Sequence, residues 1–300
     1  MRTMWTDLAM EGAGAPPGES LTGGVERTTV VIDSEEQARA LGRPMGRYVT
    51  LGCPQRMSVE LGTRRALSEA LGETISAMLP PGARTMLVTG LGNRSVTPDA
   101  LGPRTVDRVL VTRHMAGCLP EDVEERMASV CAASPGVLGV TGVETAEVLS
   151  GMVRHVKPDA VIAVDALAAR DSRRICSTIQ VADTGITPGS GVGNHRKALT
   201  RDTLGIPVIA VGVPMVVYAS TIVRDAVGML SEADGASGED EEKLMTCVER
   251  VVSEQLGELI VTPREVDALV ERMAGIVAEG INLALHPRLE EQEIAQLMAQ

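Results

Sequence analysis

Three aspartates lie in segments that follow apolar, strand-like runs, and two of these segments are rich in glycine. Asp99 lies in TGLGNRSVTPDALGP, Asp165 in AVDALAARDS and Asp183 in VADTGITPGSGVGNHRK. Ligands of open α/β sheets bind at the carboxyl ends of the strands, so carboxylates that converge there are candidates for function. Two carboxyl groups held close together in a poorly solvated cleft cannot both ionise easily, and the pKa of one of them rises. Such a pair can take a proton from water and donate another, which suffices for peptide hydrolysis.

Each aspartate also has a purely structural explanation. Asp99 follows Thr97 and Pro98, which resemble an N-cap and a first helical position, so its carboxylate could simply favour a helix dipole. Asp165 could cap a following helix, and Asp183 could shape an Asx-turn. The occurrence of all three in loops predicted to follow buried strands nevertheless favours a functional role.

The glycine-rich segment 185–193 does not match the common phosphate or nucleophile motifs. A dinucleotide fingerprint that begins at Gly189 needs glycine where Asn194 stands, and a P-loop needs serine or threonine after Lys197. Ser190 lacks the flanking glycines of a hydrolase nucleophile elbow. The four histidines also lack the HExxH spacing of zinc peptidases. Carboxylate chemistry is what remains.

Composition excludes several classes of protein. The chain has 300 residues, a net charge of −12 and no Phe, with one Trp and two Tyr. Binding to a phosphate backbone or by base stacking is therefore not expected. Five dispersed cysteines without a CxxC pair are poor material for disulfides or structural zinc. Without an apolar h-region at the N-terminus or an apolar run of about 20 residues, we expect a cytoplasmic protein and no membrane contact.

Alternating short apolar runs and amphipathic segments predict an α/β fold with a largely parallel sheet flanked by helices. Strands are expected at 27–33, 46–52, 84–90, 108–113, 159–165, 174–183 and 206–214, and helices at 58–79, 144–156 and 262–287. The last helix is predicted to begin with a capping box, with Thr262 at the N-cap, Pro263 at the first position and Glu265 at the third. Residues 231–243 are acidic and low in apolar side chains, which predicts a surface loop.

Seven segments of the chain resemble the germination protease family, spore endopeptidases that degrade small acid-soluble spore proteins. These segments are RYVTL (47–51), GLGNRSVTPDALGP (90–103), PGVLGVTGVET (135–145), KPDAVIAVDALAAR (157–170), TIQVADTGITPGSGVGNHRK (178–197), TLGIPVIAVGVPMVV (203–217) and VTPREVD (261–267). The resemblance implies a fold similar to that of the hydrogenase-maturation peptidases (phosphorylase/hydrolase-like). It also implies a homotetramer in the forespore or spore core, made as an inactive precursor that loses a short propeptide.

The resemblance further implies an aspartic-type catalytic pair, which here corresponds to Asp99 and Asp183. Asn93 and Asp165 are expected to support that pair, and no cofactor or metal is expected. A local cationic subsite formed by Arg196, Lys197 or Arg94 could receive an acidic residue of the substrate.

The N-terminal stretch TDLAME, residues 6–11, is similar to the sequence that this family cleaves: an acidic residue, a large apolar residue, Ala and then Glu. Self-cleavage is therefore expected between Asp7 and Leu8. The implied organisation is a propeptide (1–7), a flexible N-terminal arm (8–24) and a single α/β peptidase domain (25–300).

Two other functions compete with this hypothesis. The same carboxylates could be ligands in a metal-dependent peptidase. Alternatively, the glycine-rich loops could cradle a small anion in a binding module without catalytic activity. Activity after exhaustive chelation would separate the first alternative from the carboxylate mechanism, and titration with nucleotides would test the second.

Overall fold

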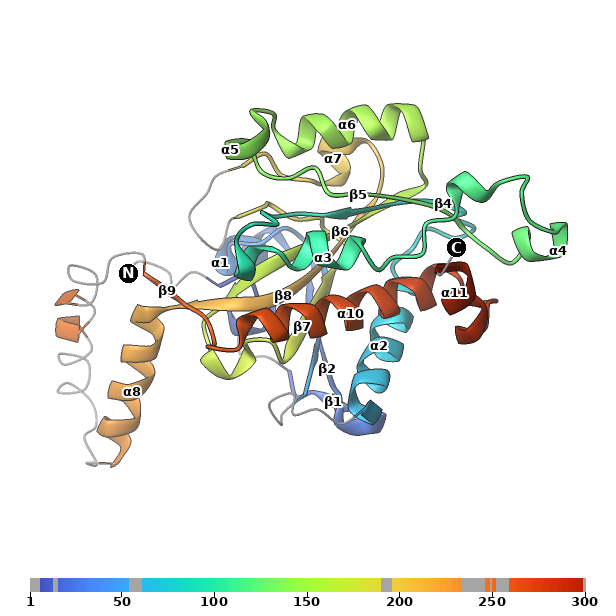
Figure 1. The fold of residues 1–300 in the computed structure, drawn as a ribbon. Coiled ribbons are helices and arrows are strands. Elements are labelled where there is room, and N and C mark those ends of the chain that lie inside the picture. The colour runs from blue at the N-terminus through green and yellow to red at the C-terminus, as the bar shows by residue number, and fades with distance from the viewer. Residues whose placement is uncertain are drawn as a thin grey trace.

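The computed structural model describes residues 6–12, 16–53, 61–189, 196–233, 246–248, 250–251 and 259–298. In this part of the chain the strands form a nine-stranded mixed sheet with helices packed on both faces (Figure 1). The α/β fold with a sheet flanked by helices that the sequence predicts is confirmed, but the sheet is mixed rather than largely parallel, because β1, β2, β3, β7 and β9 all pair in antiparallel fashion.

Four strands form the parallel half of the sheet, in the order β5-β4-β6-β8. They are β4 (Thr85–Gly90), β5 (Ser129–Ala133), β6 (Ala160–Ala169) and β8 (Val208–Tyr218). Nearly every residue of β6 and β8 is buried, because helices cover both of their faces. This is why their sequences are continuous apolar runs rather than alternating ones.

The other half of the sheet is antiparallel. It contains β1 (Glu19–Ser20), β2 (Glu26–Ile32), β3 (Gly46–Gly52) and β7 (Thr178–Ala182), with β9 (Ile260–Val261) paired to β8. Strand β7 joins the halves, since it runs antiparallel to both β3 and β8. The chain direction at β7 is therefore opposite to that of its neighbour β8, which decides where the residues after β7 lie.

Two layers of helix enclose the sheet (Figure 1). One face carries α2 (Leu61–Ser76), α3 (Leu101–Val106) and α10 (Val266–Leu285), and the other carries α6 (Thr145–Val156) and α7 (Arg201–Leu204). Helices α2 and α10 approach closely, because a Cβ on Gly72 would lie 3.1 Å from the Gly280 carbonyl oxygen. The remaining α-helices include α1 (Glu35–Leu41), α4 (Glu121–Glu124), α5 (Leu138–Thr141), α8 (Ala219–Ala233) and α11 (Glu291–Met298).

The predicted strand at 108–113 is wrong. Leu110 is buried, but its N–H donates to Oδ1 of Asn282 on α10 at 2.9 Å instead of joining a ladder. The backbone N–H of Thr112 donates to the Val130 carbonyl at 3.0 Å. The apolar run is thus a buried connection, and β5, which the sequence analysis did not predict, takes the edge of the sheet.

The predicted capping box of the last helix is also wrong. The Thr262 hydroxyl donates to the Met215 carbonyl at 3.0 Å, so it ties the chain to β8 rather than capping a helix. Helix α10 begins at Val266, after Glu265, which makes no side-chain cap. The acidic segment 231–243 overlaps the end of α8 as far as Ala233, and the rest of it lies outside the described residues.

Candidate active site

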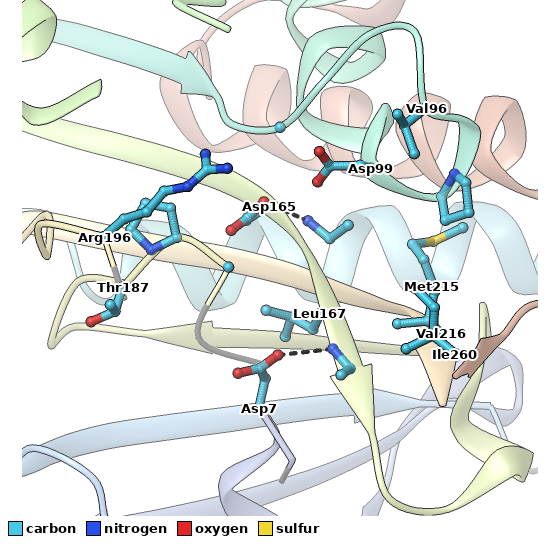
Figure 2. A pocket seen from close by; sticks show the side chains of 16 residues that line it. Asp7, Val96, Asp99, Asp165, Leu167, Thr187, Arg196, Met215, Val216 and Ile260 are labelled. Atoms are coloured by element: carbon cyan, nitrogen blue, oxygen red, sulfur yellow. Dashed lines mark hydrogen bonds between the residues drawn. The ribbon is translucent and has the colours of Figure 1, made fainter. Parts of the chain in front are cut away.

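A cavity of about 240 Å³ lies where β4 ends and the neighbouring strands β6 and β8 continue. Asp99 and Asp165 both line it, together with Asp7 from the N-terminal segment and Arg196 (Figure 2). The rest of the lining is largely apolar and includes Val96, Pro98, Leu167, Met215, Val216 and Ile260. Such a pocket, with a few polar groups that converge on it, is typical of a ligand or active site.

Asp165 projects from within β6 rather than from a loop after it. The sequence analysis ended this strand at residue 165, but β6 continues to Ala169 because β8 pairs with it over its whole later length. The Asp165 side chain is 4% exposed, and its Oδ1 accepts a hydrogen bond from the Ala166 N–H at 2.9 Å. Burial, and then the charges of Asp99 and Asp7, raise the pKa of Asp165 well above its usual range.

Asp99 reaches the pocket at the end of the short 3-10 helix η3 (Thr97–Asp99), and two close backbone contacts hold this part of the chain against β4. A Cβ on Gly102 would lie 2.3 Å from the Leu91 carbonyl oxygen, so α3 approaches the end of β4 at a distance that only glycine permits. Gly92 has a φ of 107°, and a Cβ there would lie 2.1 Å from the Asp99 carbonyl oxygen. These glycines explain the GLGN and DALGP spacing without any phosphate.

The Asp99 carboxylate is partly buried and hydrogen-bonded. Burial raises its pKa, while a hydrogen bond from the Asn93 N–H to Oδ2 (2.7 Å) and the charge of Arg196 act in the opposite direction. Asn93 therefore contacts Asp99 through its backbone. The Asn93 side chain accepts a hydrogen bond from the Ser95 N–H at 3.0 Å, which fixes the turn.

The three cations expected to form an acidic subsite lie in different places. Arg196 lines the pocket, and its charge lowers the pKa of both Asp99 and Asp165 against the larger effect of burial. Lys197 is exposed and does not line the pocket. Arg94 instead forms a two-pronged ion pair with Asp107, with Nη2 donating to Oδ1 at 2.9 Å.

Asp183 does not line this pocket. Asp183 follows β7. Because β7 is antiparallel to β8, the carboxyl end of β7 lies at the opposite end of the strands from the pocket. There Asp183 Oδ1 accepts a hydrogen bond from the Arg47 N–H at 2.8 Å, which closes the end of the β3–β7 ladder. The register brings Gln180, not Asp183, level with Gly212 and hence with Asp165.

Gln180 is a site residue that the sequence analysis missed. Its Nε2 donates to the Asp7 carbonyl oxygen at 2.8 Å, and its Oε1 accepts from the Ala9 N–H at 2.7 Å. A polar amide in the short, mostly apolar run TIQVA was the available signal, and the structure buries all five of its residues. The side chain thus holds the backbone on both sides of the Asp7–Leu8 bond.

The N-terminal segment adds to the end of β6 through its own backbone. The Asp7 N–H donates to the Ala168 carbonyl, and the Ala168 N–H donates to Asp7 Oδ2, both at 2.8 Å. Leu8 and Ala9 are fully buried, Leu8 in a cluster with Leu167 and Ala169 of β6, and Ala9 in a separate cluster with side chains of β2, β3, β7 and β8. The segment is therefore held on the folded domain as a bound peptide would be, extended at Asp7 and Leu8 and then turning into the short 3-10 helix η1 (Ala9–Glu11).

Among the described residues, no group of three or more His, Cys, Asp or Glu side chains is arranged to hold a metal ion. Within the same residues, no helix is long and apolar enough to cross a membrane. The fold and the pocket define an α/β protein with a carboxylate-lined cleft in which a peptide segment is held beside one buried and one partly buried aspartate.

Comparison with known proteins identifies the family. The family model described as germination protease matches residues 11–248 and 232–298. The chain is 42% identical to the germination protease of Caldanaerobacter subterraneus subsp. tengcongensis, over 98% of this chain and 97% of that one. It is 40% identical to the germination protease of Clostridium perfringens (strain ATCC 13124), over 91% and 88% of the two chains. It is 37% identical to that of Priestia megaterium, over 95% and 92%.

The chain belongs to the germination protease family, and it is accordingly a peptidase associated with spore germination. Among solved structures, the [NiFe] hydrogenase maturation protease HycI from Thermococcus kodakarensis KOD1 aligns with 69% of this chain and 98% of its own. The two share 20% identity with a TM-score of 0.34, a likeness too low to support an argument.

Proposed function

We propose that this protein is an endopeptidase that hydrolyses peptide bonds with Asp99 and Asp165 as a carboxylate pair. The observation that carries the proposal is that both carboxylates, each with a raised pKa, line the pocket into which Asp7 also projects. The sequence analysis paired Asp99 with Asp183, but the two do not share the pocket. Asp165 takes the place of Asp183 in the proposed pair.

The two carboxyl groups have distinct tasks. Asp165 is the acid, because it is the more deeply buried and is raised further by neighbouring negative charges. Asp99 is the base, because the Asn93 N–H and the charge of Arg196 favour its ionised form. Environments that separate the pKa values of two nearby carboxyl groups are how such pairs divide acid and base roles.

Hydrolysis then follows with balanced proton transfers. Asp99 takes a proton from water, the hydroxyl oxygen adds to the carbonyl carbon, and Asp165 gives its proton to the carbonyl oxygen. The neutral tetrahedral diol collapses as Asp99 passes its proton to the peptide nitrogen and the C–N bond breaks. Asp165 recovers a proton from one diol hydroxyl, so both groups return to their initial state.

We further propose that the protein is made as a precursor that cleaves itself between Asp7 and Leu8. The support is that Asp7 lines the pocket while β6 and Gln180 hold the backbone of that bond. The small acid-soluble spore proteins as substrates, the homotetramer and the location in the forespore or spore core belong to the same proposal, on the strength of the family.

The test is incubation of the purified chain at mildly acid pH with and without exhaustive chelation. The expected result is a new N-terminus at Leu8 that appears equally fast in both samples. Loss of processing in the chelated sample, restored by added divalent metal, would contradict the carboxylate mechanism and favour a metal-dependent peptidase. A chain that produces no new N-terminus would contradict self-processing.

A further inference from the structure

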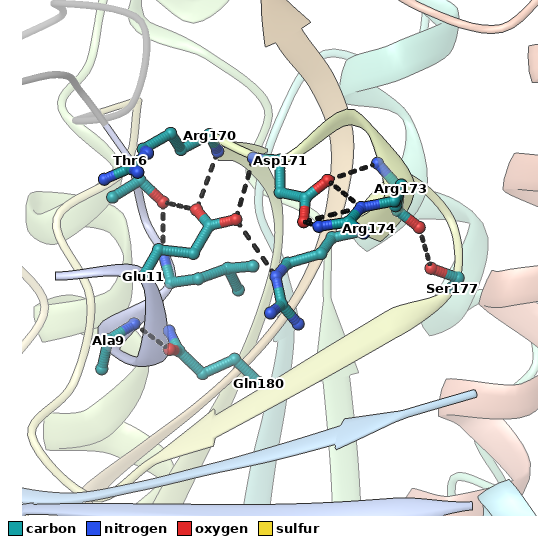
Figure 3. Close-up of polar contacts among 10 residues, drawn as sticks. Thr6, Ala9, Glu11, Arg170, Asp171, Arg173, Arg174, Ser177 and Gln180 are labelled. Atoms are coloured by element: carbon teal, nitrogen blue, oxygen red, sulfur yellow. Dashed lines mark hydrogen bonds and ion pairs between the residues drawn. The ribbon is translucent and has the colours of Figure 1, made fainter. Parts of the chain in front are cut away.

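The second acidic residue of the TDLAME segment is bound away from the catalytic pocket. The Glu11 side chain is only 5% exposed. Its carboxylate accepts hydrogen bonds from the Arg170 N–H at 2.7 Å and the Asp171 N–H at 2.9 Å, and Arg174 Nε lies 3.2 Å from its Oε1 (Figure 3). Two backbone donors and a guanidinium that surround one carboxylate make a charge-assisted binding site.

The turn after β6 builds this cradle. The Asp171 side chain accepts a hydrogen bond from the Arg173 N–H at 2.9 Å and caps the short helix η5 (Ser172–Arg174). Because the cap fixes the backbone, the N–H groups of Arg170 and Asp171 point at the same carboxylate. The cradle belongs to the folded domain, whereas its occupant belongs to the N-terminal segment.

One short peptide connects the pocket and the cradle, and its residues Ala9–Glu11 form the 3-10 helix η1. Asp7 pairs with Ala168 beside the pocket, and Glu11 follows at Arg170 and Asp171. Between them, Leu8 and Ala9 are fully buried, and Gln180 bonds the backbone on both sides of Leu8. A peptide that binds as this segment does therefore has a defined pattern: an acidic residue, two buried apolar residues, and an acidic residue at the fourth position after the cleaved bond.

We propose that the cradle formed by the N–H groups of Arg170 and Asp171 and the guanidinium of Arg174 is a specificity subsite. Resting on the endopeptidase function proposed above, it binds an acidic residue at the fourth position after the cleaved bond of a substrate, and Glu11 is its intramolecular occupant. The N–H groups can donate to either a carboxylate or an amide oxygen. Arg174 favours the carboxylate, because only a charged partner gains from its charge.

The geometry also makes the N-terminal segment a competitor. After cleavage between Asp7 and Leu8, residues 8–11 remain joined to the enzyme and can keep their contacts with Gln180 and the cradle. A substrate must displace them. A change at Glu11 that weakens its binding in the cradle should therefore slow self-processing yet speed the cleavage of a separate peptide.

The first test compares two peptides with the sequence of residues 3–14, TMWTDLAMEGAG, one of them with Gln in place of the Glu. We expect the unmodified chain to cleave the Glu peptide about 10- to 100-fold better in kcat/KM. In Arg174→Met this ratio should fall to about threefold, because the backbone donors remain. Arg154→Met, on an exposed position of α6, should keep the full ratio. Equal cleavage of the two peptides, or an unchanged ratio in Arg174→Met, would overturn the proposal.

The second test uses Glu11→Gln in the full chain. We expect slower appearance of the Leu8 N-terminus and faster cleavage of the added Glu peptide, whereas Arg174→Met should slow both. Unchanged rates for both reactions in Glu11→Gln would show that the cradle does not govern cleavage.

A binding arm separates this proposal from the endopeptidase function. Fluorescence anisotropy of the two labelled peptides with the unmodified chain and with Arg174→Met should show tighter binding of the Glu peptide, and a smaller difference in the variant. If neither peptide is cleaved but this binding difference is present, the endopeptidase function fails and the subsite stands. Cleavage without any binding or rate difference has the opposite meaning.

Discussion

The two ends of the central strands carry aspartates in similar sequence contexts but in very different surroundings. Asp165 lies within β6, beside the carboxyl end of β4. Asp183 follows β7, at the opposite end of these strands. Asp165 is 4% exposed, with other carboxylates nearby, whereas Asp183 is exposed and bonded to the Arg47 N–H. An aspartate that comes directly after an apolar, strand-like run is thus common to a reactive position and a structural one. What separates them is the direction of the strand.

The largest expected effect concerns catalysis. Asp99→Asn and Asp165→Asn should each lower the rate of peptide cleavage by about 100- to 10,000-fold, because each removes one proton transfer. Asp183→Asn should remain within about tenfold of the unmodified chain. Peptide cleavage and N-terminal sequencing measure the effect, with circular dichroism as the control for folding. A loss in Asp183→Asn as large as in the other two variants would contradict the view that Asp99 and Asp165 are catalytic and Asp183 is structural.

The next effect concerns the glycine contact that positions Asp99. In Gly102→Ala the new Cβ would lie 2.3 Å from the Leu91 carbonyl oxygen and 2.5 Å from that of Val164, so the backbone must shift. We expect a loss of about 1 to 3 kcal/mol in the free energy of unfolding, with lower activity. The matched control is Gly151→Ala, in α6, where a Cβ meets no atom within 4 Å. That variant should be neutral or more stable by up to about 1 kcal/mol. Denaturant unfolding of both distinguishes crowding from a general effect of alanine.

A third prediction uses the pH dependence of stability. Since the pKa of Asp165 is raised in the folded state, the native protein binds more protons than the unfolded one between the ordinary value, about 3.9, and the raised value. Across that window the unfolding free energy falls as pH rises, and this loss persists above it.

Asp165→Asn removes this dependence. The variant should be more stable than the unmodified chain at pH 7, by on the order of 1 to 3 kcal/mol, and the difference should shrink toward zero near pH 3. Thermal or denaturant unfolding at several pH values measures it. A variant that is less stable at pH 7 would contradict the view that the charged form of Asp165 is disfavoured by burial.

The smallest effect is expected at Asp183, at the end of the strands away from the pocket. Asp183→Ala removes the acceptor of the Arg47 N–H at the end of the β3–β7 ladder. The expected loss in unfolding free energy is about 1 kcal/mol, the usual contribution of such a hydrogen bond, with peptide cleavage retained. Hydrogen exchange should show the change confined to the end of β3. Faster hydrogen exchange around β6 instead would mean that the hydrogen bond of Asp183 also stabilises the strands beside the pocket.

Much of the fold follows from local patterns, and the exceptions have physical reasons. The β3 strand at 46–52 was predicted with the bounds that the structure has, and α6 was predicted within one residue, because periodicity, glycine and capping act locally. The run at 108–113 has the composition of a strand, but Asn282 on α10 takes its backbone donor. Thr262 has the type and spacing of an N-cap, but its hydroxyl donates to the Met215 carbonyl and α10 begins only at Val266. In both cases a partner distant in the sequence wins over the local preference.

The candidate site divides in the same way. Asp99 and its glycines could be found from the sequence, because a chain that must pass this close to β4 needs glycine at defined positions. The family could also be found there, since long motifs survive in the sequence itself. Gln180 could not be assigned, because its role depends on a segment about 170 residues away.

The sequence by itself determined the α/β class, the family and the presence of carboxylates in glycine-rich loops, since these depend on residue types and on their local spacing. Only the tertiary structure decided which aspartates face one pocket. The reason is that β7 runs antiparallel to β8. The carboxyl end of β7, with Asp183, therefore lies away from the pocket, whereas Asp165 in β6 and Asp99 line it together. Strand direction within a sheet is set by the packing of the whole chain, and no local pattern around Asp165 or Asp183 records it.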